Sequence, residues 1–192
     1  MTRDEDETRV VWLLDVDGVL NAHRPGWGAP PRTGNAHSGP DQFRIRWAPA
    51  LVARILAVHE AGLAQIRWCT TWCADVDQIE ALLGLPRFER AWTDFRQGPQ
   101  AAIAKIEAAH AVLARGDRLV WTDDDAIPSS GPDLEKLTGG RAAYPVGGGW
   151  TPHTGGGQTL TSGDGRVLLV APSPVRGLQP GHLDQIEEFL RA

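Results

Sequence analysis

Apolar and polar positions along the chain predict strands and helices in alternation. The apolar run Val10–Leu14 ends abruptly at Asp15, as expected for a strand that is buried on both faces. Between residues 49 and 62 the apolar positions instead follow helical spacing, with Pro49 in the first turn. The same two patterns recur further along. They predict strands at 63–69, 88–93, 119–122 and 167–170, and helices at 75–84, 99–115 and from residue 180 onward.

The helix expected at 75–84 carries signals for both of its ends. Asp75, with Gln78 three residues later, forms the pattern of a capping box at the start. Gly84 followed by Pro86 is typical of a helix end. These signals place the helix between two of the predicted strands.

Strands that alternate with helices predict an α/β fold, in which a mostly parallel sheet is covered by helices on both faces. Two segments interrupt this pattern. Residues 21–47 form an insert rich in Gly, Pro and Arg, and the glycine-rich residues 139–165 are expected to form a mobile loop. The length of 192 residues fits one domain, so residues 1–192 are interpreted as a single unit.

Composition narrows the class of protein. With 42% hydrophobic and 22% charged residues, the chain is typical of a soluble globular protein. No apolar run approaches the length of a membrane span, and the acidic start does not resemble a signal peptide. Cys69 and Cys73 are too few for a disulfide framework or a four-cysteine zinc site, and we interpret them as small apolar residues rather than a redox pair. We therefore expect a cytoplasmic protein with no membrane partner and no obligate protein partner.

The distribution of charge indicates a cation site. The formal net charge is −5, from 24 acidic and 19 basic residues. Nine of the acids lie in the tail 4–7 and in the groups Asp15, Asp17 and 123–125, which leaves 15 acids against 19 bases elsewhere. Aspartates held close together normally need a cation between them.

Three predicted strands are followed by a polar residue that can take part in chemistry. These residues are Asp15, Thr70 and Asp123. Ligands of open parallel sheets bind at the carboxyl ends of the strands, where the loops converge. We therefore expect these three side chains to meet, although they are far apart in the sequence.

Four segments, in matching order and spacing, resemble the motifs of the haloacid dehalogenase-like (HAD) hydrolase superfamily. They are residues 15–19 (Asp-Val-Asp-Gly-Val), residues 66–71 (Ile-Arg-Trp-Cys-Thr-Thr), Lys105, and residues 119–124 (Leu-Val-Trp-Thr-Asp-Asp). Together with Trp72 and with Gly177-Leu178 before the last helix, they are most similar to the capless HAD domain of Swiss Army Knife RNA repair proteins. The resemblance covers nearly the whole chain. It implies a three-layer Rossmann-like fold of HAD type without a full cap domain.

The resemblance also implies a mechanism and a set of roles. Asp15 would attack the phosphorus of a phosphate ester and become an aspartyl-phosphate, while Asp17 would act as general acid and base. Thr70 would bind a phosphoryl oxygen, and Lys105 would supply positive charge. Mg²⁺ is the implied cofactor because an oxygen-only site suits it. Its implied ligands are Asp15, the backbone carbonyl of Asp17, Asp123 and Asp124.

Each assignment has an alternative from the residues themselves. Asp15 and Asp17 would otherwise form a turn or capping pair. Asp125 is expected to be a loop or cap residue, although Asp124 and Asp125 could bind the metal in place of Asp123 and Asp124. Thr71 is a further substrate-binding candidate, with a helix cap or turn as its alternative. Lys105 would otherwise be a solvated helix residue, but the chain holds 17 arginines and only two lysines, which favours a specific role.

The insert 21–47 follows the nucleophile motif directly, where the family places a small flap over the site. Its charge is +3, and the stretch Phe43–Trp47 places Arg44 and Arg46 on one side of an extended segment. Such a flap would grip a polynucleotide end through phosphate contacts and stacking. The alternative is a solvated hairpin whose aromatic residues pack on the core.

Neither the insert nor the stretch between Thr70 and Lys105 is long enough for a full cap domain. An open site suits a large substrate, because small metabolites usually need a lid. The sequence thus favours a phosphatase for a terminal phosphate of RNA or DNA, as in end healing. The alternatives are a phosphatase for a nucleotide or other small phosphoester, and a non-catalytic module that binds phosphate or nucleic acid.

Overall fold

The computed structural model describes residues 9–139, 151–152 and 156–192, and a seven-stranded sheet forms the centre of this part of the chain. The strands of this sheet are β1 (Val10–Leu14), β4 (Gln65–Trp68), β5 (Glu89–Arg90), β6 (Arg118–Thr122), β7 (Thr151–Pro152), β8 (Gly157–Thr161) and β9 (Val167–Pro172). The helices are α1 (Pro49–Glu60), α2 (Val76–Leu83), α3 (Gly98–Ala114), α4 (Pro132–Leu137) and α5 (Pro180–Arg191).

The strand order of the central sheet is β5-β4-β1-β6-β9-β8-β7. Strands β5, β4, β1, β6 and β9 pair in parallel, whereas β8 pairs antiparallel with β9 and β7 antiparallel with β8. From β1 the chain first builds the side of β4 and β5 and then crosses to build the side of β6 and β9. This confirms the predicted α/β architecture with a mostly parallel sheet, and it is compatible with a Rossmann-like fold.

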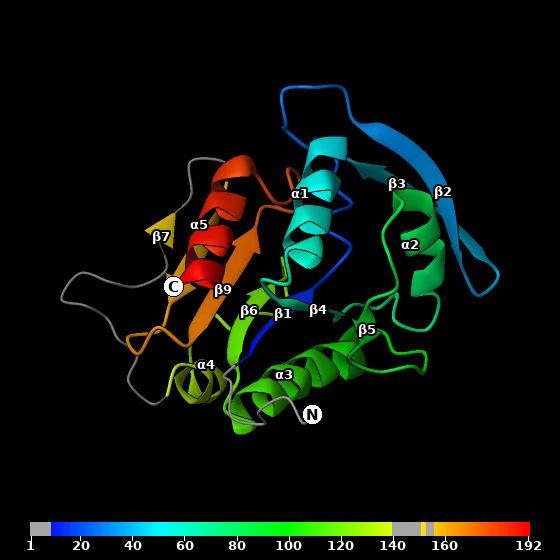
Figure 1. Ribbon diagram of the computed structural model, residues 1–192. Helices are drawn as coiled ribbons and strands as arrows, with labels where there is room; N and C mark the ends of the chain where they lie inside the picture. The colour runs from blue at the N-terminus through cyan, green and yellow to red at the C-terminus, as the bar shows by residue number, and fades with distance from the viewer. Residues whose placement is uncertain (1–8, 140–150, 153–155) are drawn as a thin grey trace, which may run out of the picture.

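Helices cover both faces of the sheet (Figure 1). Helix α1 contacts α5 on one face, and α3 contacts β6 and α4 on the other. The core between these layers contains Trp12, Trp68 and Trp121, which are fully buried as expected for strand residues of this sheet. No helix in the described ranges is both long enough and apolar enough to pass through a bilayer.

The insert 21–47 contains a β-hairpin that lies outside the main sheet. Its strands are β2 (Arg32–Ser38) and β3 (Asp41–Trp47), joined by the two-residue turn Gly39-Pro40. Figure 1 shows the hairpin beside α2, and β2 contacts this helix. The hairpin forms because every second residue of β3 near its end is apolar and buried, with Ile45 and Trp47 facing the core.

The capping box predicted for α2 is wrong. Asp75 precedes the helix, but its side chain makes no capping hydrogen bond. One of its carboxylate oxygens instead accepts hydrogen bonds from the hydroxyl of Ser38, at 2.9 Å, and from the backbone N–H of Gly39, at 3.2 Å. A tertiary contact to the hairpin turn has therefore replaced the local cap. The predicted end of α2 is confirmed, since Gly84 adopts the left-handed conformation with φ of 71°.

The predicted loop 139–165 is partly wrong. Strand β8 lies inside it and pairs with β9 over five residues of each strand, and β7 also falls within the same range. The rest of that prediction falls on residues 140–150 and 153–155, which lie outside the described residues. Helix α4 was not expected from the sequence either.

Candidate functional site

The polar residues that follow β1 and β6 lie side by side at the carboxyl end of the sheet. These two strands are neighbours, and the backbone N–H of Asp15 donates to the carbonyl oxygen of Thr122 at 3.1 Å. After β1 the chain continues to β4 and β5 on one side of the sheet, and it later adds β6 on the other side of β1. The loops that follow β1 and β6 therefore run in different directions from this point. In α/β sheets this is the place where a crevice for ligands forms.

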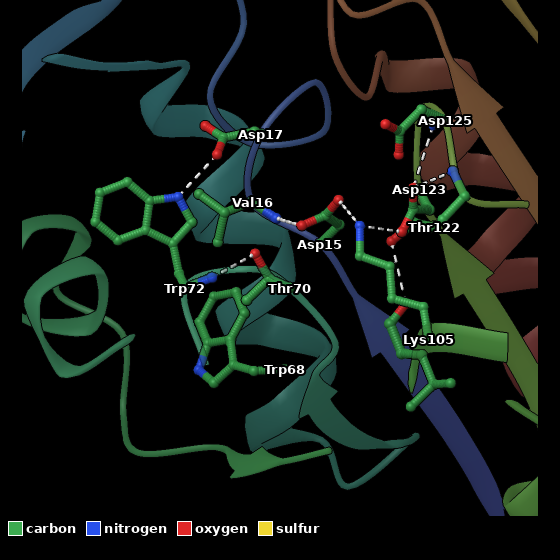
Figure 2. A network of polar contacts seen from close by, with 12 residues as sticks. Asp15, Val16, Asp17, Trp68, Thr70, Trp72, Lys105, Thr122, Asp123 and Asp125 are labelled. Carbon is green, nitrogen blue, oxygen red and sulfur yellow. Dashed lines mark hydrogen bonds and ion pairs between the residues drawn. The ribbon is translucent and has the colours of Figure 1, made fainter. Parts of the chain in front are cut away.

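Lys105 of α3 joins the two carboxylates that these strands present (Figure 2). Its Nζ atom lies 2.7 Å from Oδ2 of Asp15 and 2.8 Å from Oδ2 of Asp123. All three side chains are buried, at 5% exposure or less. The sequence prediction that these residues meet is therefore confirmed. Lys105 is not a solvated helix residue.

The buried charges shift one another's pKa values. Burial raises the pKa of Asp15 well above its usual range, the negative charge of Asp123 raises it further, and the Lys105 ammonium opposes both effects. For Lys105 burial favours the neutral amine, but Asp15 and Asp123 outweigh it and raise the pKa of the ammonium above its ordinary value. Lys105 is thus a permanent positive charge that is shared by two carboxylates.

Four carboxylates form a single cluster in this place. Oxygens of Asp15, Asp123, Asp124 and Asp125 all lie within 4.8 Å of one another. With Lys105, these groups carry a formal charge of −4 + 1 = −3 when fully ionised. Burial, followed by the charges of Asp125 and Asp123, raises the pKa of Asp124 to about 6. The carboxylates repel one another, and the single ammonium of Lys105 does not neutralise their negative charge.

The cluster fits a divalent cation such as Mg²⁺. Its donors are all carboxylate oxygens, and two oxygens on opposite sides of Mg²⁺ lie about 4.2 Å apart, which is within the spread of the cluster. Apart from the Lys105 ammonium, no donor in the described chain reaches the buried Oδ2 of Asp123, so this oxygen keeps an unused lone pair. Gly18 has a φ of 67°, and the carboxylate of Asp124 occupies the space that a Cβ would need there. The glycine of the first motif therefore makes room for Asp124.

Asp123 and Asp125 have different positions within the cluster. The backbone N–H groups of Asp125 and Ala126 donate to Oδ1 of Asp123, at 3.2 and 2.8 Å. The carboxylate that stabilises this turn is thus that of Asp123. Asp125 lies in the loop as expected, and its more exposed carboxylate belongs to the cluster. From the sequence, Asp123 and Asp124 were the favoured metal ligands, and the pair Asp124 and Asp125 was left open as the alternative.

The side chain of Asp17 is not part of the cluster. It is exposed, and Figure 2 shows it pointing toward Trp72 and away from Lys105. Oδ2 accepts a hydrogen bond from the indole N–H of Trp72 at 2.8 Å, and Oδ1 accepts one from the side-chain amide of Asn21 at 2.7 Å. Both oxygens are therefore fixed at the open side of the site. This placement suits a proton-transferring group better than a carboxylate ligand of the cation.

The two threonines after β4 differ in their environment. Thr70 is fully buried, its hydroxyl lowers the pKa of the neighbouring Asp15 carboxyl, and its oxygen accepts the backbone N–H of Trp72 at 3.3 Å. Thr71 is half-buried. The structure thus brings Thr70 to the nucleophile candidate. Cys69 and Cys73 on either side are buried and free, and burial raises the pKa of both thiols, as expected for apolar structural residues.

The hairpin places its arginines and its aromatic residues on opposite faces. Trp47 is buried, and the ring of Phe43 meets the edge of Trp72 with 5.4 Å between centroids. Arg44 and Arg46 alternate with these residues along β3 and line a hollow on the other face. Stacking of bases on the interleaved aromatic residues was one expectation for this insert. The packing of Trp47 in the core favours the alternative for that residue, whereas Phe43 is 42% exposed.

Two residues in contact with Asp17 were given no role from the sequence, although both belong to the motifs that carry the resemblance. Asn21 lies in the loop that returns from Asp17, where the backbone N–H of Gly18 donates to its carbonyl oxygen. An Asn four residues after an Asp-x-Asp-Gly turn is a signal that could have been used. The contact of Trp72 with Asp17 has no local signal, since it joins residues 55 positions apart.

Comparisons with known proteins were made at three levels. No protein-family model matches the chain, and neither a curated protein nor a solved structure matches it. The site is therefore interpreted from the positions and the chemistry of its own residues.

Proposed function

We propose that this protein is a Mg²⁺-dependent phosphatase that hydrolyses a phosphomonoester through an aspartyl-phosphate, in the manner of the HAD hydrolases that its motifs resemble. One observation carries the proposal. A buried lysine is held between two carboxylates, Asp15 and Asp123, at the carboxyl ends of adjacent central strands, and two further carboxylates lie within reach of the same point. A purely structural ion pair would not need the additional, mutually repelling carboxylates.

Asp15 is the nucleophile in this proposal. One of its oxygens forms a bond to phosphorus while the bond to the leaving oxygen breaks, which gives an aspartyl-phosphate. Asp17 donates a proton to the leaving oxygen and later removes one from the water that attacks the phosphorus. That second step releases inorganic phosphate and restores the carboxylate of Asp15. Oδ1 of Asp15 accepts the backbone N–H of Val16 and Oδ2 accepts the Lys105 ammonium, and the attack on phosphorus uses a remaining lone pair of this carboxylate.

The remaining residues stabilise negative charge. Lys105 provides a fixed positive charge beside the nucleophile, and the hydroxyl of Thr70 is available to a phosphoryl oxygen. Mg²⁺, when bound by Asp15, Asp123 and Asp124, supplies the charge that lets an anionic nucleophile approach an anionic phosphate. Asp125 is a fourth candidate ligand, and the backbone carbonyl of Asp17 remains a predicted one.

The proposed substrate is the terminal phosphate of a polynucleotide. The insert after β1 is a hairpin and not a cap domain, so it does not enclose the substrate as a lid would. Its Arg44 is exposed, and its Arg46 is half-buried next to the loop that carries Asp17. An open site with a basic flank suits a large anionic substrate.

A substrate panel tests this function. The protein is incubated with Mg²⁺ and with oligonucleotides that carry a 3′- or a 5′-phosphate, with mononucleotides and with p-nitrophenyl phosphate. We expect phosphate release that requires Mg²⁺ and that falls by at least about 10⁴-fold in Asp15→Asn. At neutral pH this variant should be at least as stable as the wild type, since burial already disfavours the charge of Asp15. Equal release by the variant would contradict the nucleophile assignment. Release from mononucleotides alone would contradict the polynucleotide substrate.

A further inference from the structure

The hairpin and the loop after the first motif line an open hollow beside the proposed active site. It has a volume of about 410 Å³ and is lined by Asn21, Ala22, His23, Arg44 and Arg46. This volume lies in the range of small-molecule sites in proteins, which is roughly 300–1,000 Å³. None of the five lining residues is acidic.

The positive charge in this hollow is not neutralised. Across the described ranges, no carboxylate lies within ion-pair distance of the Arg44 guanidinium, whereas Arg67 and Arg90 each contact one and Arg54 contacts two. Arg46 donates to the backbone carbonyl of His23 at 2.8 Å, which fixes its guanidinium at the wall of the hollow without cancelling its charge. Two arginines of one strand face therefore present cationic donors toward a space large enough for a phosphate and its attached sugar.

Asn21 connects this hollow with the proposed active site. It lines the hollow, its side-chain amide donates to Asp17, and its side-chain oxygen accepts the backbone N–H of Arg46 at 2.9 Å. The hollow and the acid/base candidate are thus separated by a single residue. An anion held by Arg44 and Arg46 would therefore lie beside Asn21, the residue that contacts Asp17.

We propose that the hollow binds the internucleotide phosphate adjacent to the terminal phosphate that is removed. The proposal rests on the function proposed above and makes it more specific. The substrate is then recognised as a chain of at least two nucleotides, by its backbone and not by its bases. The aromatic residues of the hairpin lie on the opposite face from the hollow: Trp47 is buried there, and Phe43, 42% exposed, contacts the edge of Trp72.

Arg44→Gln tests the proposal, and Arg32→Gln is the matched control. Arg32 is also an exposed arginine of the hairpin, but it does not line the hollow. kcat/KM is measured for a terminally phosphorylated dinucleotide and for p-nitrophenyl phosphate, which has no second phosphate. We expect the ratio of the two values to fall about tenfold in Arg44→Gln, the loss typical of one charge-assisted hydrogen bond, and to be unchanged in Arg32→Gln. The dependence of log KM on log salt concentration should also become shallower, by about 0.7.

A binding measurement separates the failure of this proposal from the failure of the proposed function. Fluorescence anisotropy of a labelled, terminally phosphorylated oligonucleotide is recorded with Asp15→Asn and with Asp15→Asn/Arg44→Gln. A roughly tenfold weaker affinity of the double variant supports the subsite even if no phosphatase activity is found. Equal affinities, or the same change in Arg32→Gln as in Arg44→Gln, would overturn it.

Discussion

The carboxylate cluster and the arginine hollow contrast in how they are built. Asp15, Lys105 and Asp123 are buried, come from three elements far apart in the sequence, and contact one another directly. Arg44 and Arg46 lie two positions apart on one strand of an outer hairpin, and Arg44 is exposed without a partner of opposite charge in the described part of the chain. The first group depends on the whole fold, and the second depends on one local element. We infer that chemistry resides in the first and recognition of the substrate in the second.

The energetic consequences differ as well. A buried charge that loses its partner costs several kcal/mol, because its desolvation is no longer offset. An exposed arginine contributes about 0–1 kcal/mol to stability. Substitutions in the cluster should therefore change both folding and activity, whereas substitutions in the hairpin should change substrate binding alone.

The largest effect on stability is expected from Lys105→Met. This change leaves Asp15 and Asp123 buried next to each other without the ammonium that they share. We expect the free energy of unfolding at neutral pH to fall by about 3–5 kcal/mol, measured by urea denaturation in EDTA. Addition of Asp15→Asn should recover part of this loss, because one of the two repelling charges is removed. A loss below about 1 kcal/mol would contradict the cluster as described.

The two regions are not independent, since Trp72 joins them. Its indole N–H binds Asp17 and its ring contacts Phe43 of the hairpin. In Trp72→Phe the ring remains but the N–H is lost, so Asp17 keeps only its hydrogen bond with Asn21. We expect kcat for a phosphate ester with an alkyl leaving group to fall about tenfold, with little change in KM. p-Nitrophenyl phosphate, whose leaving group needs no proton, should be affected much less.

Trp92→Phe is the matched control for this variant. Trp92 is also a nearly buried indole, but its N–H makes no hydrogen bond within the described residues. It should leave kcat unchanged for both substrates. If Trp72→Phe slows both substrates equally, Trp72 has a structural role and does not position Asp17.

The sequence predicted the elements and contacts correctly where the local residue pattern matches the environment of those residues in the fold. The apolar runs of β1 and β6 became central strands, and the unusual lysine in an arginine-rich chain lies between the carboxylates that follow them. A parallel sheet brings such strand ends together whatever the length of the connections, so the meeting of Asp15 and Asp123 could be predicted.

Contacts of the hairpin could not be predicted in this way. Asp75 has the sequence pattern of a helix cap, yet its carboxylate binds Ser38 and Gly39, because the hairpin turn offers donors that a local pattern does not reveal. Likewise β8 lies in a glycine-rich stretch whose composition predicts a loop, and it forms a strand by pairing with β9. The choice of Trp72 as partner of Asp17 also depends on tertiary placement alone.

The smallest expected effect is a pH dependence of stability. It should come from a carboxylate of the cluster and not from one of the hairpin. In the folded protein the pKa of Asp124 is raised to about 6, mainly by burial and then by the charges of Asp125 and Asp123. A raised pKa means that the folded state holds its proton more tightly than the unfolded chain. The stability that Asp124 contributes is therefore fully present below its ordinary pKa near 4 and is lost as the pH rises through about 6.

Asp124→Asn should remove the loss of stability that occurs as the pH rises. The control is Asp41→Asn, which changes an exposed residue of the hairpin. In EDTA we expect Asp124→Asn to raise Tm relative to the wild type by about 3 °C at pH 7.5, which corresponds to about 1 kcal/mol for a half-buried group, and by less at pH 4.5.

Mg²⁺ should raise the Tm of the wild type more at pH 7.5 than at pH 5, since a protonated Asp124 cannot act as a ligand. It should raise the Tm of Asp124→Asn less at either pH, and it should act on Asp41→Asn as on the wild type. A Mg²⁺ effect that is the same in all three proteins would place the cation elsewhere and would leave the cluster as an ion-pair network around Lys105.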